Sequence, residues 1–201
     1  MSRVELRAAG ATHAGSVRDT NEDAYVVDPG LGLYAVFDGM GGAMAGDVAA
    51  RKARDVIHEY VRARRASIAP PQLLAAAINA ASAVVYGEAM ARRDRQGMGT
   101  TAVVCLVVDE RRAVVAHVGD SRGYLLREGR LDQLTRDHTV VAELLERGAI
   151  SVEDAARSAY RNVLSRNLGG KPEARVDLTE VALRPGDRLL LCSDGLHGYA
   201  S

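Results

Sequence analysis

Hydrophobic residues recur at steps of three and four positions in two stretches of the first half of the chain, which is the pattern of helices with one buried face. The first stretch spans residues 45–65, and its opposite face carries charges of both signs. The second begins at Pro70-Pro71, and its apolar stripe runs from Leu74 to Val85. The pattern predicts two amphipathic helices. The mixed charges on the first favour a solvated face over a basic nucleic-acid surface.

Apolar and β-branched residues then follow one another without alternation, which predicts strands that are covered on both faces. Four such runs are expected to be strands: 33–37, 101–108, 113–118 and 189–192. Strands of this kind favour sheets that lie between other layers. Two short helices are expected on an excursion from the sheets, within residues 139–147 and 151–160.

Two polar turns organise the middle of the chain into hairpins. Residues 109–112 are polar and separate two apolar runs, so a regular hairpin would place Val108 opposite Ala113. A second turn is expected at Glu128-Gly129, between two further strands. The two hairpins predict antiparallel pairing through the centre of the fold.

Length and composition predict one globular domain that covers residues 1–201. The chain is 47% apolar and 26% charged, and its 26 basic residues balance its 26 acidic ones. This balance gives no general attraction to nucleic acid or to an anionic membrane, so any affinity for phosphate must come from a local site. No apolar stretch is expected to span a bilayer, and the N-terminus lacks the apolar core of a signal peptide. Cys105 and Cys192 lie in apolar runs and are expected to be buried, so a cytoplasmic location is favoured.

Three of the predicted strands end in an aspartate beside a glycine, at Asp38, Asp120 and Asp194. A single Asp-Gly pair indicates only a turn, but three at the ends of core strands favour a site, because strand ends hold side chains in fixed positions. Clustered carboxylates repel one another unless a cation neutralises them, and oxygen ligands select Mg²⁺ or Mn²⁺. Two such ions can activate a water molecule for attack on phosphorus. The five histidines are scattered, and neither cysteine has a CxxC partner, so zinc is not expected.

Glycines beside the first aspartate suit such a site. Gly39 has no Cβ, so its backbone can approach a metal and offer its carbonyl oxygen. Gly41 and Gly42 are expected to leave an open floor next to it. A further polar segment holds Arg18, whose planar guanidinium can bind phosphate, although on its own such an arginine indicates only a surface residue.

Five segments together resemble the motifs of the type-2C metal-dependent serine/threonine protein phosphatases in their bacterial form. In order they are Thr12–Arg18 with Asn21-Glu22-Asp23, Asp38–Gly42, Gly97–Thr101, His117–Arg122 and Leu191–Leu196. Their order and spacing agree over nearly the whole chain. The resemblance implies an α+β fold, a four-layer α-β-β-α sandwich of two antiparallel sheets flanked by helices. It also implies a variable flap segment at about residues 136–165.

The resemblance further implies a centre of two core ions, Mn²⁺ or Mg²⁺, and a third, weaker ion. Asp38 would bridge both core ions, and the carbonyl oxygen of Gly39 would bind one of them. Asp194 would bind a core ion, and Asp120 with Asp194 would hold the third. The reaction implied is hydrolysis of phosphoserine and phosphothreonine in proteins by a metal-bridged hydroxide, opposing serine/threonine kinases.

Other roles follow from the same resemblance. Glu22 and Asp23 would act mostly through metal-bound water, and Arg18 would hold the substrate phosphate. The flap would help to choose substrates. The partners implied are phosphorylated proteins, including kinases and their substrates, and a monomer that binds neither nucleic acid nor membrane is expected.

The sequence departs from the family pattern in two places. Met40 stands where many eukaryotic members have a histidine that is thought to protonate the leaving oxygen, so no general acid is assigned. The chain also reaches Ser201 before the last metal aspartate of the family, in an Asp-Asn motif on the final strands. It is therefore expected to be C-terminally incomplete, without the last strands of the family fold. The alternative function is a non-catalytic pseudophosphatase that binds phosphorylated partners.

Overall fold

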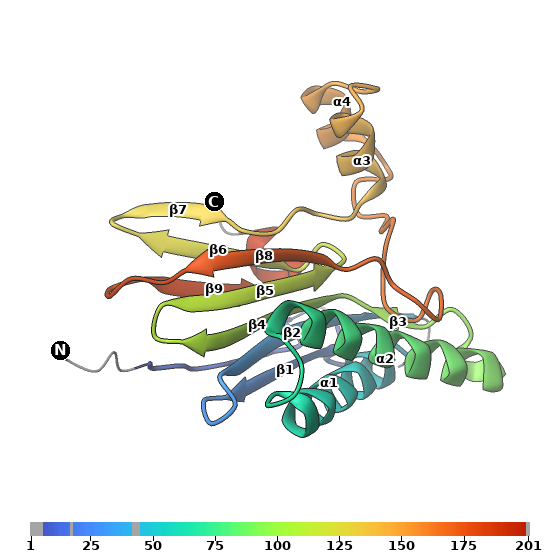
Figure 1. Cartoon of the computed structure of the whole chain (residues 1–201). Coiled ribbons are helices and arrows are strands. Elements are labelled where there is room, and N and C mark those ends of the chain that lie inside the picture. Colours follow the sequence, from blue (N-terminus) through green and yellow to red (C-terminus); the bar gives the residue numbers. More distant parts are fainter. Residues whose placement is uncertain (1–5, 17, 42–44, 200–201) are drawn as a thin grey trace.

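A computed structural model describes residues 6–16, 18–41 and 45–199 of the protein (Figure 1). Gly42, which was expected to form part of an open floor, therefore lies outside the described residues. The helices are α1 Ala45–Arg64, α2 Pro70–Ala91, the 3-10 helix η1 Arg93–Arg95, α3 Val140–Glu146, α4 Val152–Arg157 and α5 Asp194–His197. The strands are β1 Asp23–Asp28, β2 Leu33–Met40, β3 Gly99–Thr100, β4 Ala102–Asp109, β5 Arg112–Val118, β6 Arg122–Arg127, β7 Arg130–Gln133, β8 Asp177–Ala182 and β9 Arg188–Cys192.

Two antiparallel sheets form the body of the protein. The first has the strand order β1-β2-β4-β5-β8, with β3 paired to β2, and the second has the order β7-β6-β9. Helices α1 and α2 cover the outer face of the first sheet, whereas α3 and α4 stand away from both sheets (Figure 1). The expected α+β fold of two antiparallel sheets with flanking helices is confirmed.

Alternation along the strands divides the core into two layers. Residues such as Phe37, Val104 and Val114 face the helices and form the larger buried cluster. Their neighbours Val36, Val103 and Val115 face the second sheet and form a smaller cluster between the sheets. Strands β4 and β5 are therefore apolar on both faces, as their unbroken hydrophobic runs predicted.

The central hairpin differs from its expected register. Val107, not Val108, lies opposite Ala113, and Asp109 pairs with Arg112 across a β-bulge. The extra residue in the bulge shifts the pairing by one position, which sequence alternation could not reveal because both strands are apolar on both faces. The bulge decides which face each β4 side chain takes opposite β5.

Helix α2 corrects a second expectation. By length and composition alone, this helix is long and apolar enough to cross a membrane. Its residues Leu74, Ile78 and Val85 are fully buried in the core against α1 and the first sheet. In this fold the helix therefore packs as a core helix.

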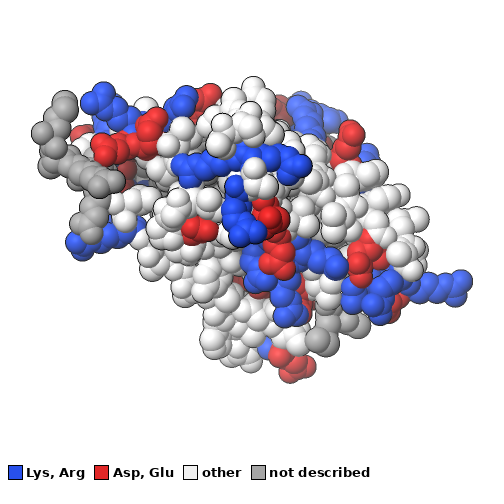
Figure 2. Space-filling view, turned by 60° about the horizontal axis from the view of Figure 1, so that its bottom comes forward, with Lys and Arg blue, Asp and Glu red and all other residues white. Residues whose placement is uncertain are grey.

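The surface of α1 carries charges of both signs. Figure 2 shows basic and acidic side chains interspersed over one face of the molecule. Ion pairs along α1 join such residues, for example Arg54 with Asp55 at 2.8 Å and Arg62 with Glu59 at 2.5 Å. The charged face expected for the first helix is thus a face of mixed, paired charges.

Candidate metal centre

Two of the expected site residues lie opposite each other on neighbouring strands. Strand β1 pairs with β2 so that Asp23 faces Asp38 directly. Ala24 and Phe37, the next residues on each strand, are buried against the helices. Alternation therefore places both carboxylates on the other face of the sheet, toward the second sheet.

Asp194 comes to this pair from the second sheet. It follows β9 as the first residue of α5, and its carboxyl group lies close enough to form a hydrogen bond with Asp38. Ser193, the N-cap residue, donates a hydrogen bond from Oγ to Oδ2 of Asp23 at 3.0 Å. The end of β9 is thereby tied to the end of the first sheet, although the two segments are far apart in sequence.

Asp120 completes the cluster from the turn between β5 and β6. Its charge acts on Asp38, and that of Asp194 acts on it. The structure therefore brings together the three strand-end aspartates that the sequence singled out, and it places Asp23, which the family resemblance named, opposite Asp38.

Burial and mutual repulsion disturb the acidity of these groups. The pKa of Asp38 is raised to about 8, first by burial and then by the charges of Asp23 and Asp194. The pKa of Asp120 is raised to about 6 by burial and by Asp194. The pKa of Asp23 is also raised, mainly by burial, although the hydrogen bond from Ser193 opposes the shift. Carboxylates in such surroundings gain a large stabilisation from a bound cation.

Close backbone packing requires a glycine at position 39. Its N–H donates to the carbonyl oxygen of Glu22 at 3.1 Å. A Cβ at this position would lie 2.1 Å from the carbonyl oxygen of Gly46, at the start of α1. The backbone of β2 and the first turn of α1 are therefore in contact here, and this contact also keeps the side chain of Glu22 beside Gly46.

Arg18 lies at the rim of the cluster. Its Nη1 is 3.8 Å from Oε2 of Glu22, and its side chain is 60% exposed whereas that of Glu22 is 18% exposed. Its positive charge also acts on Asp23. A guanidinium that is anchored beside the carboxylates and open to solvent can meet a phosphate that arrives from outside.

Hydroxyl groups that the sequence did not single out hold Asp38 in place. The N–H of Asp38 donates to Oγ1 of Thr101 at 3.0 Å, and Oγ1 of Thr100 donates to the Asp38 carbonyl oxygen at 3.0 Å. Oγ1 of Thr101 also lies 2.6 Å from Oγ of Ser121, the residue after Asp120. The two threonines of the Gly97–Thr101 motif thus connect two acidic segments, and the position of that motif was the only sequence signal for them.

A second polar cluster adjoins the first. It consists of His117, His138 and Asp177, whose possible metal-binding atoms all lie within 4.8 Å of one another. Among the described residues, no other group of three or more His, Cys, Asp or Glu side chains is this close. The histidines that appeared scattered along the sequence are therefore in part collected by the fold. Burial first, and then the neighbouring His117, lowers the pKa of His138 to about 4, so this ring is neutral at physiological pH.

The four aspartates do not converge on a single point, since they form no group of three within that distance. Their oxygen-only donors are those that Mg²⁺ and Mn²⁺ prefer. The residues present therefore fit the divalent centre that the sequence predicted.

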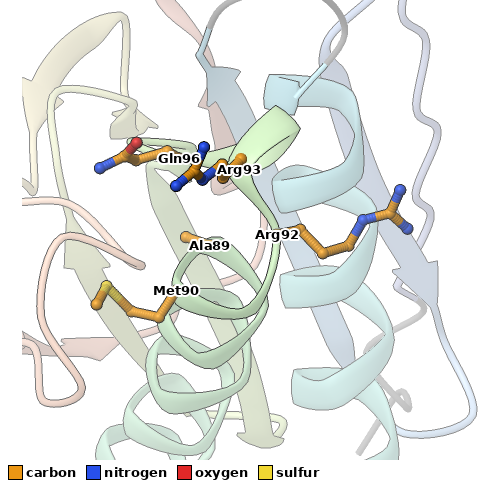
Figure 3. A pocket seen from close by; sticks show the side chains of 5 residues that line it. All are labelled: Ala89, Met90, Arg92, Arg93 and Gln96. Carbon is orange, nitrogen blue, oxygen red and sulfur yellow. The ribbon is translucent and has the colours of Figure 1, made fainter.

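A surface hollow lies elsewhere and has no acidic lining. It has a volume of about 440 Å³ at the end of α2 and is lined by Ala89, Met90, Arg92, Arg93 and Gln96 (Figure 3). Arg92 points away from Met90 in this view and pairs with Asp94 at 3.0 Å. None of the residues that line the hollow can offer a carboxylate to a metal ion.

Solved structures identify the class of protein that combines this fold with such a site. The serine/threonine phosphatase PstP of Mycobacterium tuberculosis matches with a TM-score of 0.83 at 37% identity, over 93% of this chain and 77% of that one. A structure of the PstP catalytic domain in complex with two manganese ions matches with a TM-score of 0.77 at 36% identity, over 93% and 76%. The class is that of the protein phosphatases.

Sequence comparison then gives the family. The model of the family described as protein phosphatase 2C matches residues 11–150. The serine/threonine phosphatase stp of Listeria welshimeri is 38% identical over 197 residues, which are 95% of this chain and 78% of that protein. The chain belongs to the protein phosphatase 2C family, and the resemblance found in its motifs is confirmed.

Proposed function

We propose that this protein hydrolyses phosphoserine and phosphothreonine in other proteins with the help of two divalent ions, Mn²⁺ or Mg²⁺. The observation that carries the proposal is the cluster of Asp23, Asp38, Asp120 and Asp194, in which the pKa values of the first three are raised by burial and by neighbouring charges. Such a cluster is costly without cations and well suited to hold them. The names of the bacterial relatives support the same activity.

The position of each proposed ligand indicates which ion it would bind. Asp38, at the centre of the cluster, would touch both core ions, with the Gly39 carbonyl oxygen on one of them. Asp194 would bind a core ion, and with Asp120 it would hold a third, weaker one. When bound, the ions supply positive charge for the phosphoryl oxygens and a water molecule of increased acidity.

The protein's own groups then position the substrate. Arg18 would hold the phosphate oxygens through its planar fork, since it is exposed and lies next to the acidic cluster. Glu22 and Asp23 would orient water around the ions, with Asp23 fixed by Ser193. Met40 follows Gly39 and carries no proton to donate, so the leaving serine or threonine oxygen must take its proton from another source.

The biological setting follows from the proposed reaction. Substrates would be phosphorylated proteins, including serine/threonine kinases and their targets, so the enzyme would oppose such kinases. We expect a cytoplasmic monomer that acts without nucleic acid or membrane.

Phosphate release from phosphoserine and phosphothreonine peptides tests the proposal. Release should require Mn²⁺ or Mg²⁺, and Asp38→Ala should reduce it by about a thousandfold or more, because a bridging ligand is lost. Asp55→Ala is the matched control, since Asp55 is an exposed aspartate on α1 that pairs with Arg54. Full metal-dependent activity in Asp38→Ala would refute the role of Asp38. Calorimetry that detects no Mn²⁺ binding to the wild-type chain would favour the non-catalytic binding module instead.

A further inference from the structure

The cluster of His117, His138 and Asp177 joins three segments next to the metal centre. His117 lies on β5 directly opposite Asp177 on β8, and His138 lies at the start of the flap segment, residues 136–165. The two imidazole rings are stacked, with centroids 4.6 Å apart, and each histidine is only 3% exposed. The two histidines are therefore buried and fixed in place, and Asp177 is partly exposed beside them.

Hydrogen bonds show that this cluster is not itself a metal site. The N–H of Gly119 donates to Nδ1 of His138 at 3.1 Å, so the proton of this neutral ring is on Nε2. That nitrogen lies 3.2 Å from Oδ2 of Asp177, to which its N–H donates, and 3.1 Å from Nη1 of Arg166, so a cation already lies beside it and no lone pair is left for an ion. Nη1 of Arg166 lies 2.9 Å from Oδ1 of Asp177. The guanidinium therefore already balances the negative charge of the carboxylate, as a metal ion would.

The same bonds clamp the backbone just before Asp120. Gly119 donates its N–H to the His138 ring and accepts the His138 N–H on its carbonyl oxygen at 3.0 Å. Its φ is +103°, and a Cβ there would lie 2.6 Å from Cγ2 of Thr101. Gly119 is therefore held in a left-handed conformation, with His138 and Thr101 as its neighbours, and this conformation sets the direction in which Asp120 leaves β5.

His138 is also the point where the two ends of the flap segment meet. Its carbonyl oxygen accepts the N–H of Ser165 at 2.9 Å, and Thr139 forms a bridge with Leu164. The preceding residue, Asp137, makes a two-pronged ion pair with Arg122, at 2.7 and 2.9 Å, just beyond Asp120 in sequence. The base of the flap is thus attached on both sides of Asp120.

We propose that His138 is a positioning residue that couples the base of the flap to Asp120 through Gly119. The role of Asp120 as a metal ligand in this coupling rests on the proposed function. Displacement of the flap base by a bound protein substrate would move His138, and with it the backbone that carries Asp120. Substrate binding at the flap and ion binding at Asp120 are then linked, and each changes the affinity for the other by the same factor.

Two amide substitutions separate this role from simple packing. The side-chain oxygen of an asparagine takes the place of Nδ1, so His138→Asn keeps an acceptor for Gly119, whereas His138→Gln places its amide near Nε2 and loses that acceptor. Hydrogen exchange of the Gly119 amide is measured on the metal-free protein. We expect about tenfold faster exchange in His138→Gln and less than about threefold change in His138→Asn. The paired control is His58→Asn and His58→Gln, since His58 contacts Asp28 at 2.8 Å away from this cluster.

Mn²⁺ titration of the same proteins provides the second measurement. The weakest Mn²⁺ site should lose about tenfold in affinity in His138→Gln and keep its affinity in His138→Asn. Equal effects of the two substitutions on Gly119 exchange, or no effect of either, would overturn the proposal. If His138→Gln does not fold, the test rests on His138→Asn. Faster hydrogen exchange of the Gly119 amide in His138→Asn than in the wild type would then contradict the coupling. The exchange measurement needs neither substrate nor metal, so it stays interpretable even if phosphate release by the wild-type protein fails.

Discussion

The raised pKa of Asp38 predicts that this residue destabilises the metal-free protein. The pKa rises from 3.8 to about 8 on folding, so between these values the folded protein holds a proton that the unfolded chain has released. The free energy of unfolding must therefore fall as pH rises through this window. At about 1.4 kcal/mol for each tenfold difference in proton affinity, this pKa difference corresponds to at most about 6 kcal/mol.

Asp38→Asn removes this charge with little change in shape. Asp38 shares its repulsion with Asp23 and Asp194, and water reaches part of the site, so we expect a gain on the order of 2–4 kcal/mol in the unfolding free energy at pH 8. The gain should shrink as pH falls toward 4, because both states of the wild type then take up the proton. Urea unfolding in a chelator, repeated at several pH values, measures both effects.

Added Mn²⁺ should reverse the order of stability. The wild-type protein gains stability by binding ions, whereas Asp38→Asn loses a central ligand and gains much less. Asp55→Asn, on the exposed face of α1, should stay within about 0.5 kcal/mol of the wild type under every condition. Two results would refute this account of the cluster. One is a metal-free Asp38→Asn protein that is less stable than the wild type at pH 8. The other is a difference in unfolding free energy between the two proteins that does not change with pH.

Three further outcomes are expected. Thr101→Val should cost about 1–3 kcal/mol in urea unfolding because the N–H of Asp38 loses its acceptor, whereas Thr101→Ser should stay close to the wild type. Gly39→Ala should cost more than about 3 kcal/mol, since its Cβ would meet backbone, whereas Gly87→Ala on α2 has open space and should gain about 0.5–1 kcal/mol. Arg18→Lys should raise KM for a phosphopeptide about tenfold while calorimetry shows unchanged Mn²⁺ affinity, and equal losses in both would contradict its role as a phosphate ligand.

Local patterns were sufficient for the elements that bury a continuous stripe or run of apolar residues. Helices α1 and α2 and strands β4, β5 and β9 were all expected within a few residues of their observed bounds. Strands β1, β3 and β8 were not predicted. Strand β8 alternates between partly exposed and exposed positions over most of its length, so it has no apolar run, and it is defined by its pairing with β5.

For the candidate site too, the sequence indicated some features and the tertiary structure decided others. Sequence alone singled out Asp38, Asp120 and Asp194 as candidate ligands, because each ends a buried strand beside a glycine, and the ordered motifs indicated a protein phosphatase family. Only the tertiary structure decided that Asp23 faces Asp38, that Thr101 connects Asp38 to Ser121, and that His138 reaches Gly119. These contacts join segments from different strands and loops, and their register depends on bulges, turns and close backbone packing. No single stretch of the chain contains that information, since it arises only when two sheets and a flap are packed together.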